Sequence, residues 1–482
     1  MVTKKHTKKQ DKKQAKNIRN DQEEKVIPVT ASTPYGLCSE RLSSFGGLTI
    51  LVKFLSLIEV EKIFNEIYIK PLRKAELGCY KMVLGILIML FVGYQRIAHI
   101  ANLQKDSIIC GILKVSCLPV VSTFWRYLNS LGERQAWSLM EINREVRSRV
   151  WHLTDYHPNR IRVNIDTTVS TVYGDIEKAH KGHNRKHRGK EGYRPVLCFI
   201  DETREYLCGS QRTGKTMNKK EAGKYIRQIR TLLPENIKNV LITGDAEFLG
   251  WPSIEECEEA GYWYIFANKR CKPTFPEDGW YTYKDYEYNE CLYQPGTWKQ
   301  PCRFVAMRIR EEDEQQEALF PEANYTYRVF ITNRQMLPHN VIAEYDKRAD
   351  VENSIKEAQS EGIMAIPSKK FKKNQCFFQI AMFAYNIWRW IKLIAACSQT
   401  EEDSLNSKSI KKSREHQDTI RTSRLKKLYV PAKLTFHENR GNILYSTFDV
   451  RSAGVMDFLR YLDRKRRNKY TWPQLPELKD TG

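Results

Sequence analysis

Long apolar runs are missing from this sequence. The longest, residues 82–92, is too short for a membrane helix, which needs about 20 consecutive apolar residues. Residues 1–25 also lack the apolar stretch of a secretory signal and are rich in lysine instead. We therefore expect a protein that has no membrane partner and stays in the cytoplasm.

Closely spaced cysteine pairs are missing as well. The chain of 482 residues has 12 cysteines, but no two of them have the Cys-x-x-Cys spacing of zinc and redox sites. Disulfide frameworks are typical of small secreted domains, and this chain has neither their size nor their cysteine pattern. We expect reduced thiols, most of them buried as small apolar side chains.

Acidic residues are scarce relative to basic ones. The sequence has 57 Asp and Glu residues against 79 Lys and Arg residues, so its formal net charge is +22. An excess of this size on a soluble chain is typical of proteins with a polyanionic partner. Nucleic acid is therefore the first candidate partner.

The pattern along the chain divides it into several parts, as its length predicts. Residues 1–30 are polar and lysine-rich, which is typical of a disordered basic arm. Residues 31–155 carry apolar side chains at steps of three and four, which predicts an all-α domain. Residues 401–482 are strongly basic, and we expect them to contact a DNA backbone or a second subunit.

Two short helices within the all-α part are candidates for a helix-turn-helix. They are predicted at residues 94–101 and 119–128, and the second carries Arg126 on its first turns. A helix-turn-helix would place this arginine against DNA. The alternative is that the two helices only pack on each other.

Strands and helices alternate over residues 156–400. Strands are predicted at 162–166, 194–201, 205–212, 239–243 and 262–267, and helices at 220–233 and 252–260. This βββαβαβ order is the order of the ribonuclease-H-like fold. In that α/β fold the first and fourth strands are neighbours in a mixed sheet.

An aromatic-rich stretch, residues 272–324, interrupts the alternating pattern and predicts a β-rich insertion. Within it, Trp280 and Trp298 either stack on an everted base or build a small core. After the insertion, the pattern predicts a strand at 325–332 and a long helix that begins at Pro338.

Three acidic residues occupy informative places in this pattern. Asp166 and Asp245 each end a short β-branched run, and Glu352 lies on the helix that begins at Pro338. One edge of the sheet would bring the three carboxylates together. Carboxylates without His or Cys suit Mg²⁺, which prefers hard oxygen ligands, better than they suit zinc.

The spacing on the same helix is a second signal. Four residues follow one another at steps of three, four and four, and so share one helix face: Tyr345, Arg348, Glu352 and Lys356. Glu357 is the acidic alternative to Glu352 on this helix. The spacing to Tyr345 and Arg348 favours Glu352.

These motifs together resemble those of bacterial insertion-sequence transposases of the DDE superfamily, the cut-and-paste kind. Four segments carry the resemblance, which covers most of the chain: Ile165-Asp-Thr-Thr168, Gly192-Tyr-Arg-Pro195, Gly244-Asp-Ala-Glu-Phe248 and Tyr345-x-x-Arg348-x-x-x-Glu352.

The resemblance implies a function and a set of partners. Such enzymes cleave and transfer DNA strands at the terminal inverted repeats of a mobile element, with Mg²⁺ as cofactor and Mn²⁺ as its substitute. Asp166, Asp245 and Glu352 would be the catalytic residues and would hold two metal ions. The resemblance also implies a homodimer on double-stranded DNA, including target DNA, associated with a bacterial nucleoid.

DNA contacts are predicted at several basic and polar residues. Arg348 would clamp a phosphate through its planar guanidinium, with Tyr345 beside it and Lys356 adding charge. Lys186 and Arg188 belong to a loop with several histidines. DNA binding by this loop is favoured over a metal site because no cysteine or carboxylate accompanies the three histidines, His180, His183 and His187.

Two positions depart from the pattern of these transposases. A lysine usually follows the glutamate by seven positions, but Gln359 stands there and Lys356 lies one turn earlier. Many relatives have an arginine two positions before the second aspartate, where this chain has Thr243. Two alternatives therefore stay open: a DNA-binding repressor that has lost catalysis, and a nuclease of the same fold.

Overall fold

The computed structural model describes residues 27–182, 184, 187–234, 237–310, 325–399, 406–437 and 440–474. Residues 41–482 form one compact unit. Residues 27–40 belong to a separate unit and have no regular helix or strand. Most of the predicted basic arm, residues 1–26, lies outside the described residues.

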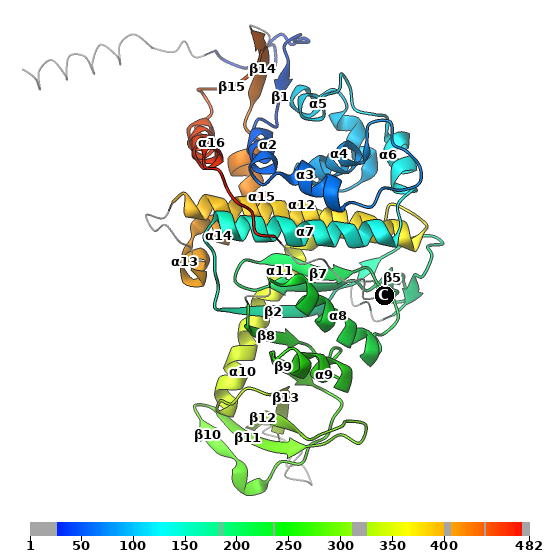
Figure 1. The fold of residues 1–482 in the computed structure, drawn as a ribbon, viewed down its shortest axis with the longest axis vertical. Coiled ribbons are helices and arrows are strands. Elements are labelled where there is room, and N and C mark those ends of the chain that lie inside the picture. The colour runs from blue at the N-terminus through cyan, green and yellow to red at the C-terminus, as the bar shows by residue number, and fades with distance from the viewer. Residues whose placement is uncertain are drawn as a thin grey trace, which may run out of the picture. The chain divides into compact units, whose positions relative to one another are not determined.

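A mixed sheet organises the chain from residue 160 to residue 332 (Figure 1). Over the described residues it has nine strands in the order β10-β11-β12-β13-β9-β8-β2-β6-β7. Their bounds are β2 (Arg160–Thr167), β6 (Val196–Ile200), β7 (Glu205–Ser210), β8 (Asn239–Gly244), β9 (Trp263–Asn268), β10 (Tyr281–Tyr283), β11 (Tyr286–Tyr293), β12 (Cys302–Arg310) and β13 (Tyr325–Thr332).

The pairing within this sheet is that of the ribonuclease-H-like fold. β2 pairs with β8 in parallel and with β6 antiparallel, while β8 pairs with β9 in parallel and β6 with β7 antiparallel. The predicted fold class is therefore confirmed, and its first and fourth strands, here β2 and β8, are neighbours. Both strands are almost wholly buried, as their apolar and β-branched runs predict.

The strands of the predicted insertion extend this same sheet. β10, β11 and β12 follow one another as antiparallel neighbours, and β13 joins them to β9. Residues 311–324, at the end of the insertion, lie outside the described residues. A small three-stranded sheet after β2 consists of β3 (Ser170–Thr171), β4 (His180–Lys181) and β5 (Glu191–Tyr193).

The helices of this part pack on the sheet. α8 (Lys219–Leu232) contacts β7, and α9 (Trp251–Glu259) contacts β9 and α8. The long helix predicted from Pro338 is divided into α10 (Pro338–Asp346), a 3₁₀ turn (Lys347–Ala349) and α11 (Asp350–Ala358). A π-helical turn (Gln359–Ile363) ends it, and Gly362 supplies the left-handed φ of 104° at which the chain leaves the helix.

The N-terminal part is helical, as the sequence predicts. Its elements are α2 (Leu48–Leu57), α3 (Val60–Ile67), α4 (Cys79–Phe91), a 3₁₀ helix (Ile97–Leu103), α5 (Ser107–Leu113), α6 (Val121–Leu128) and α7 (Glu133–Leu153). α7 runs beside α12 (Phe371–Cys397), and both lie between the other N-terminal helices and the sheet (Figure 1).

The two helices predicted as a helix-turn-helix are not consecutive. The first is the 3₁₀ helix Ile97–Leu103, and the second is α6. α5 lies between them because Asp106 caps a further helix, accepting hydrogen bonds from the backbone N–H groups of Ile108 and Ile109.

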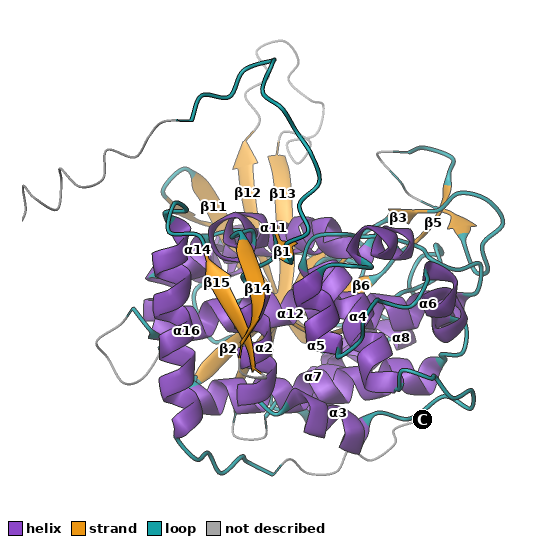
Figure 2. Cartoon of the chain, turned by 90° about the horizontal axis from the view of Figure 1, so that it is seen from above, coloured by secondary structure: helices purple, strands orange, loops and turns teal. Residues whose placement is uncertain are grey.

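The C-terminal region packs on the N-terminal part. Its elements are α13 (Ser407–Lys412), α14 (Arg414–Gln417), α15 (Ile420–Ser423), a π-helical turn (Arg424–Leu428), β14 (Ala432–His437), β15 (Arg440–Tyr445) and α16 (Arg451–Arg467). β14 pairs with β1 (Leu42–Ser43), and α16 packs on α2 (Figure 2). Ile410 on α13 is fully buried, so this polar segment is anchored to the rest of the fold by an apolar side chain.

A buried carboxylate joins the long helices to the sheet. Glu205 on β7 accepts hydrogen bonds from the Nε of Arg147 at 3.0 Å and from the indole N–H groups of Trp151 and Trp390 at 2.8 Å. All four side chains are buried. Because the carboxylate is paired with Arg147 and accepts three hydrogen bonds, the contact tolerates burial and fixes α7 and α12 against β7.

All twelve cysteines are free, and six of them are buried. No helix in the described part of the chain combines the length and the apolar character of a membrane span.

A lysine on α12 should make the stability of the protein depend on pH. Lys392 is 1% exposed, and its amine donates to the backbone carbonyl of Asp418. Burial, reinforced by Arg389 and Arg204, lowers the pKa of Lys392 to about 6. The unfolded chain therefore binds more protons than the folded one above pH 6, so stability rises with pH until the unfolded lysine also loses its proton.

We predict that Lys392→Met raises the free energy of unfolding by about 1–3 kcal/mol at pH 7, and that the gain shrinks towards pH 10. Urea unfolding at several pH values measures it. Lys372→Met, at an exposed position of the same helix, is the matched control and should change stability by less than about 0.5 kcal/mol at every pH. A gain for Lys392→Met that is constant with pH would contradict a neutral buried amine.

Candidate active site

The register of two parallel strands brings the two predicted aspartates together. Ile165 on β2 pairs with Gly244, the last residue of β8, and the residue that follows each of them is the predicted carboxylate, Asp166 or Asp245. The side chain of Asp166 is 18% exposed. Burial raises the pKa of Asp166 to about 6, against the opposing effect of Arg348, and Asp245 and Glu352 raise it further. The negative charges of Asp245 and Glu352 therefore raise the pKa of Asp166 at this edge of the sheet.

Arg348 is the cation that sits on this edge. Its guanidinium lies 3.0 Å from Oδ2 of Asp166 and donates to the backbone carbonyl of Ile165 at 3.1 Å. Although burial opposes it, the charge of Asp166 together with Tyr345 and Asp245 raises the pKa of Arg348. The buried Nε of Arg348 has no hydrogen-bond partner among the described residues. One N–H donor of this arginine is thus unpaired among these residues.

Tyr345 lies beside this pair and packs on the sheet. Its hydroxyl is 3.4 Å from the backbone carbonyl of Gly244, and its ring packs on Phe330. The Arg348 guanidinium lies 5.8 Å from the centre of the Tyr345 ring. The predicted shared helix face is therefore observed for these two residues, across the 3₁₀ turn that divides α10 from α11.

The two glutamates of α11 have different surroundings. Glu352 is exposed and lies close enough to raise the pKa of Asp166. Glu357 is half-buried and paired with Arg389 of α12, and it accepts a hydrogen bond from the backbone N–H of Ile420 at 2.6 Å. Glu357 is thus committed to holding the helix, and Glu352 is the carboxylate that remains open to a ligand.

A fourth carboxylate near the site was not assigned a role from the sequence. Glu247 accepts hydrogen bonds from Arg194 at 2.7 Å and from the hydroxyl of Thr167 at 3.1 Å. Its own backbone N–H donates to Oδ1 of Asp245 at 3.0 Å. Glu247 therefore ties the ends of β2 and β8 together. The sequence does hold one indication of this role. Glu247 lies two residues after Asp245, in a motif in which we assigned a role to the aspartate alone.

The two departures from the family pattern have local explanations. Thr243 is fully buried and donates to the side-chain oxygen of Asn164 at 2.5 Å, a position with no space for an arginine. Gln359 donates to the hydroxyl of Thr168 at 2.5 Å, so it links the end of α11 to the segment after β2. Lys356 is exposed and has no ion-pair partner within the described part of the chain.

The donor set has the chemistry of a divalent-cation site. Among the described residues no group of three His, Cys, Asp or Glu side chains is close enough to count as a formed metal cluster. The site nevertheless has three carboxylates, those of Asp166, Asp245 and Glu352. Arg348 is the cation that pairs directly with one of them, Asp166. Arg194 is already paired with Glu247 at 2.7 Å. Oxygen ligands with excess negative charge fit Mg²⁺, which could be held by Asp166, Asp245 and Glu352.

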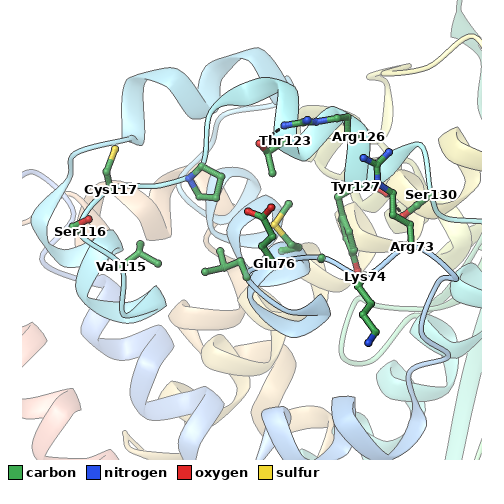
Figure 3. A pocket seen from close by; sticks show the side chains of 14 residues that line it. Arg73, Lys74, Glu76, Val115, Ser116, Cys117, Thr123, Arg126, Tyr127 and Ser130 are labelled. Atoms are coloured by element: carbon green, nitrogen blue, oxygen red, sulfur yellow. Dashed lines mark hydrogen bonds between the residues drawn. The ribbon is translucent and has the colours of Figure 1, made fainter.

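Arg126, predicted to contact DNA, lies on the wall of a cavity of about 600 Å³ in the N-terminal part. Its guanidinium donates to the hydroxyl of Thr123 at 3.0 Å. Figure 3 shows Arg73 and Arg126 towards one end of this cavity and Cys117 at the other. Lys74 also lines the cavity, which therefore carries an excess of positive charge.

The predicted basic loop is described only in part. Arg188 is exposed, whereas Lys186 and His183 lie outside the described residues. Trp298 is buried between Trp251 and Phe304 and belongs to the core, whereas Trp280 is half-buried and packs against Arg308.

Comparison with known proteins identifies the family. The sequence model of the family described as "Transposase DDE domain group 1" matches residues 38–413, so the chain belongs to this family of transposases. The predicted resemblance to DDE transposases is thereby confirmed. No curated protein matches the sequence.

Among solved structures, the chain is similar to the one titled "Cryo-EM structure of piggyBac transposase synaptic complex with hairpin DNA". The two share 11% identical residues, with a TM-score of 0.42 over 89% of this chain and 87% of that chain.

Substitution of the two glutamates of α11 should separate structural support from site chemistry. We predict that Glu357→Gln lowers the free energy of unfolding by about 2–4 kcal/mol, because it leaves the buried Arg389 without a charge partner. Glu352→Gln should change it by less than about 0.5 kcal/mol, since this side chain is exposed. Chemical unfolding monitored by tryptophan fluorescence measures both, and equal losses in the two variants would refute the assignment.

Proposed function

We propose that this transposase cleaves and transfers DNA strands at the terminal inverted repeats of an insertion sequence, with Asp166, Asp245 and Glu352 as its catalytic, Mg²⁺-holding residues. The observation that supports the proposal most is the half-buried ion pair of Asp166 and Arg348 next to Asp245, where two parallel strands end. Mutually repelling carboxylates at such an edge are costly to the fold and are typical of functional sites.

Bound at these carboxylates, Mg²⁺ or its substitute Mn²⁺ would neutralise charge on the scissile phosphate and make water a nucleophile at neutral pH. The residues of the chain orient the ligands. Arg348 holds Asp166, and Glu247 holds the turn of Asp245 through its backbone N–H. Because Glu352 is exposed, its carboxylate is free to turn towards the other two.

Arg348 is also the proposed phosphate clamp. Its Nε is a buried donor without an acceptor, and the Nε of Arg194 is another, among the described residues. A phosphate oxygen at the sheet edge would satisfy such donors with charge-assisted hydrogen bonds. Tyr345 contributes by packing beside Arg348.

The remaining DNA contacts are proposed for exposed cations. Arg126, Arg188 and Lys356 are all exposed and would bind the backbone of double-stranded DNA, as would Lys186 in the same loop as Arg188. We further propose that two copies of the chain act as a homodimer on paired element ends and on target DNA, associated with a bacterial nucleoid. The formal charge of +22 supports a polyanionic partner.

The decisive experiment is Mg²⁺-dependent cleavage of duplexes that carry the ends of the element encoding this chain. We predict that the wild-type protein cuts at the repeat boundary, and that Asp166→Asn, Asp245→Ala and Glu352→Gln each reduce the rate more than about 100-fold, because each removes a metal ligand. Binding of the same duplexes should change little in the three variants.

Asp350→Asn is the matched control for this experiment. Asp350 is an exposed carboxylate two residues before Glu352 on the same helix, and its variant should cleave at the wild-type rate. A wild-type protein that binds the ends and never cuts them would favour a repressor. Cutting without joining to target DNA would favour a nuclease.

A further inference from the structure

The two aspartates at the sheet edge differ in their ion pairs. Arg348 pairs with Asp166 at 3.0 Å, but Asp245 forms no ion pair with any described residue. Its Oδ1 accepts a hydrogen bond from the backbone N–H of Glu247 at 3.0 Å. Burial raises the pKa of Asp245, whereas the charges of Arg348 and Arg194 lower it. The charge of Arg194 therefore acts on Asp245 although these two side chains do not pair.

Glu247 is the carboxylate that binds Arg194. Its Oε2 accepts hydrogen bonds from Nη2 of Arg194 at 2.7 Å and from the hydroxyl of Thr167 at 3.1 Å. The same Nη2 lies 3.4 Å from that hydroxyl, so the three groups contact one another in a closed triangle. The other oxygen, Oε1, accepts from the backbone N–H of Met217 at 3.3 Å. Both oxygens of Glu247 are thus bound by groups of the chain itself.

This ion pair has little access to solvent. The side chain of Arg194 is 17% exposed and that of Glu247 is 10% exposed. The backbone of Arg194 is fixed as well, because its N–H donates to the carbonyl of Arg212 at 3.1 Å. Without the charge of Glu247, an arginine held in this way would need another anion within reach, since an unpaired buried charge is costly. The carboxylate of Asp245, which has no ion pair, is such an anion.

An arginine that paired with Asp245 would oppose a divalent metal ion at the same carboxylate. Both would approach the same oxygens, and two positive charges at such short range repel each other. Arg348 already occupies this position at Asp166. A second arginine, at Asp245, would reduce the excess negative charge that favours a divalent ion at the sheet edge. The pairing of Arg194 with Glu247 is therefore what leaves Asp245 open.

We propose that Glu247 is a positioning residue of the active site, which binds Arg194 and so keeps Asp245 free to hold a divalent metal ion. The proposal rests on the proposed function, because it takes Asp245 as a metal ligand. Glu247 itself is not a ligand in this arrangement, since both of its oxygens already accept hydrogen bonds from the chain. Its role is exerted through the arginine, and this makes the role separable by substitution.

The test is metal binding by single and paired variants of the full chain, without DNA. Binding of Mn²⁺ is followed by the electron paramagnetic resonance signal of the free ion, and the part of it that Asp245→Ala abolishes reports on the site. The variants are Glu247→Gln, Arg194→Gln and the two combined. Glu256→Gln on α9 is the matched control, because the Glu256 side chain is also 10% exposed and pairs with an arginine, Arg227 of α8.

We expect Glu247→Gln to weaken Mn²⁺ binding roughly 10- to 100-fold, the usual effect of losing a residue that orients a metal ligand. Removal of the arginine as well should restore binding, so the double variant should come within about threefold of the wild-type Kd. Arg194→Gln alone should bind Mn²⁺ at least as tightly as the wild type, and Glu256→Gln should match it. Glu247→Asp, which keeps the charge on a shorter side chain, is a second background in which a smaller loss should again be reversed by Arg194→Gln.

A double variant that binds Mn²⁺ as weakly as Glu247→Gln would overturn the proposal, because Glu247 would then support the fold or hold the ion directly. Unchanged binding by Glu247→Gln would overturn it as well. The Asp245→Ala variant separates this role from the proposed function. If Asp245→Ala abolishes binding and the pair shows no coupling, the role of Glu247 alone fails. If Asp245→Ala leaves all Mn²⁺ binding intact, the proposed metal site fails and the role of Glu247 fails with it.

Discussion

The parallel pairing of β2 with β8 is the constraint on which the proposed site depends. Its register sets Ile165 opposite Gly244, so the aspartates that follow them leave the sheet at the same edge. A shift of one residue in either strand would turn one carboxylate to the opposite face. The surrounding structure fixes this register through the buried runs of both strands and through Glu247, which contacts Thr167 and the turn of Asp245.

Ion pairs stabilise the edge of the sheet at which Asp166 and Asp245 lie. Arg348 pairs with Asp166 while the half-buried Glu247 is paired with Arg194, so each arginine stabilises one end of the paired strands. The helix that carries Arg348 is itself fastened from behind. Arg389 on α12 and Arg424 in the C-terminal region pair with Glu357 and Glu361. Residues distant in sequence therefore position one helix face against the aspartates.

Most of the framework could be predicted from the sequence because it rests on local signals. Short β-branched runs, with a proline or glycine at their ends, defined β2, β8 and β9, and helix spacing placed Tyr345, Arg348 and Glu352 on one face. What could not be predicted depends on tertiary contacts. Arg424 belongs to a basic run and gives no sign of burial, yet Glu361 and two backbone carbonyls pair with it.

The same reason applies to the 3₁₀ turn between α10 and α11 and to the contacts of Glu247. Each depends on how separate elements meet, and a periodic pattern does not record this. The helix-turn-helix prediction failed for a local reason instead, since Asp106 caps an additional helix that the apolar pattern did not separate.

The most direct measurement of the central claim is to map where a metal ion sits on the full chain. Fe²⁺ takes the place of Mg²⁺ in carboxylate sites and, with peroxide, cuts the backbone next to its ligands. A metal site at the three carboxylates predicts cuts close to residues 166, 245 and 352 that excess Mg²⁺ suppresses. Cuts confined to the histidine-rich segment around residue 180, or none that Mg²⁺ suppresses, would contradict a three-carboxylate metal site.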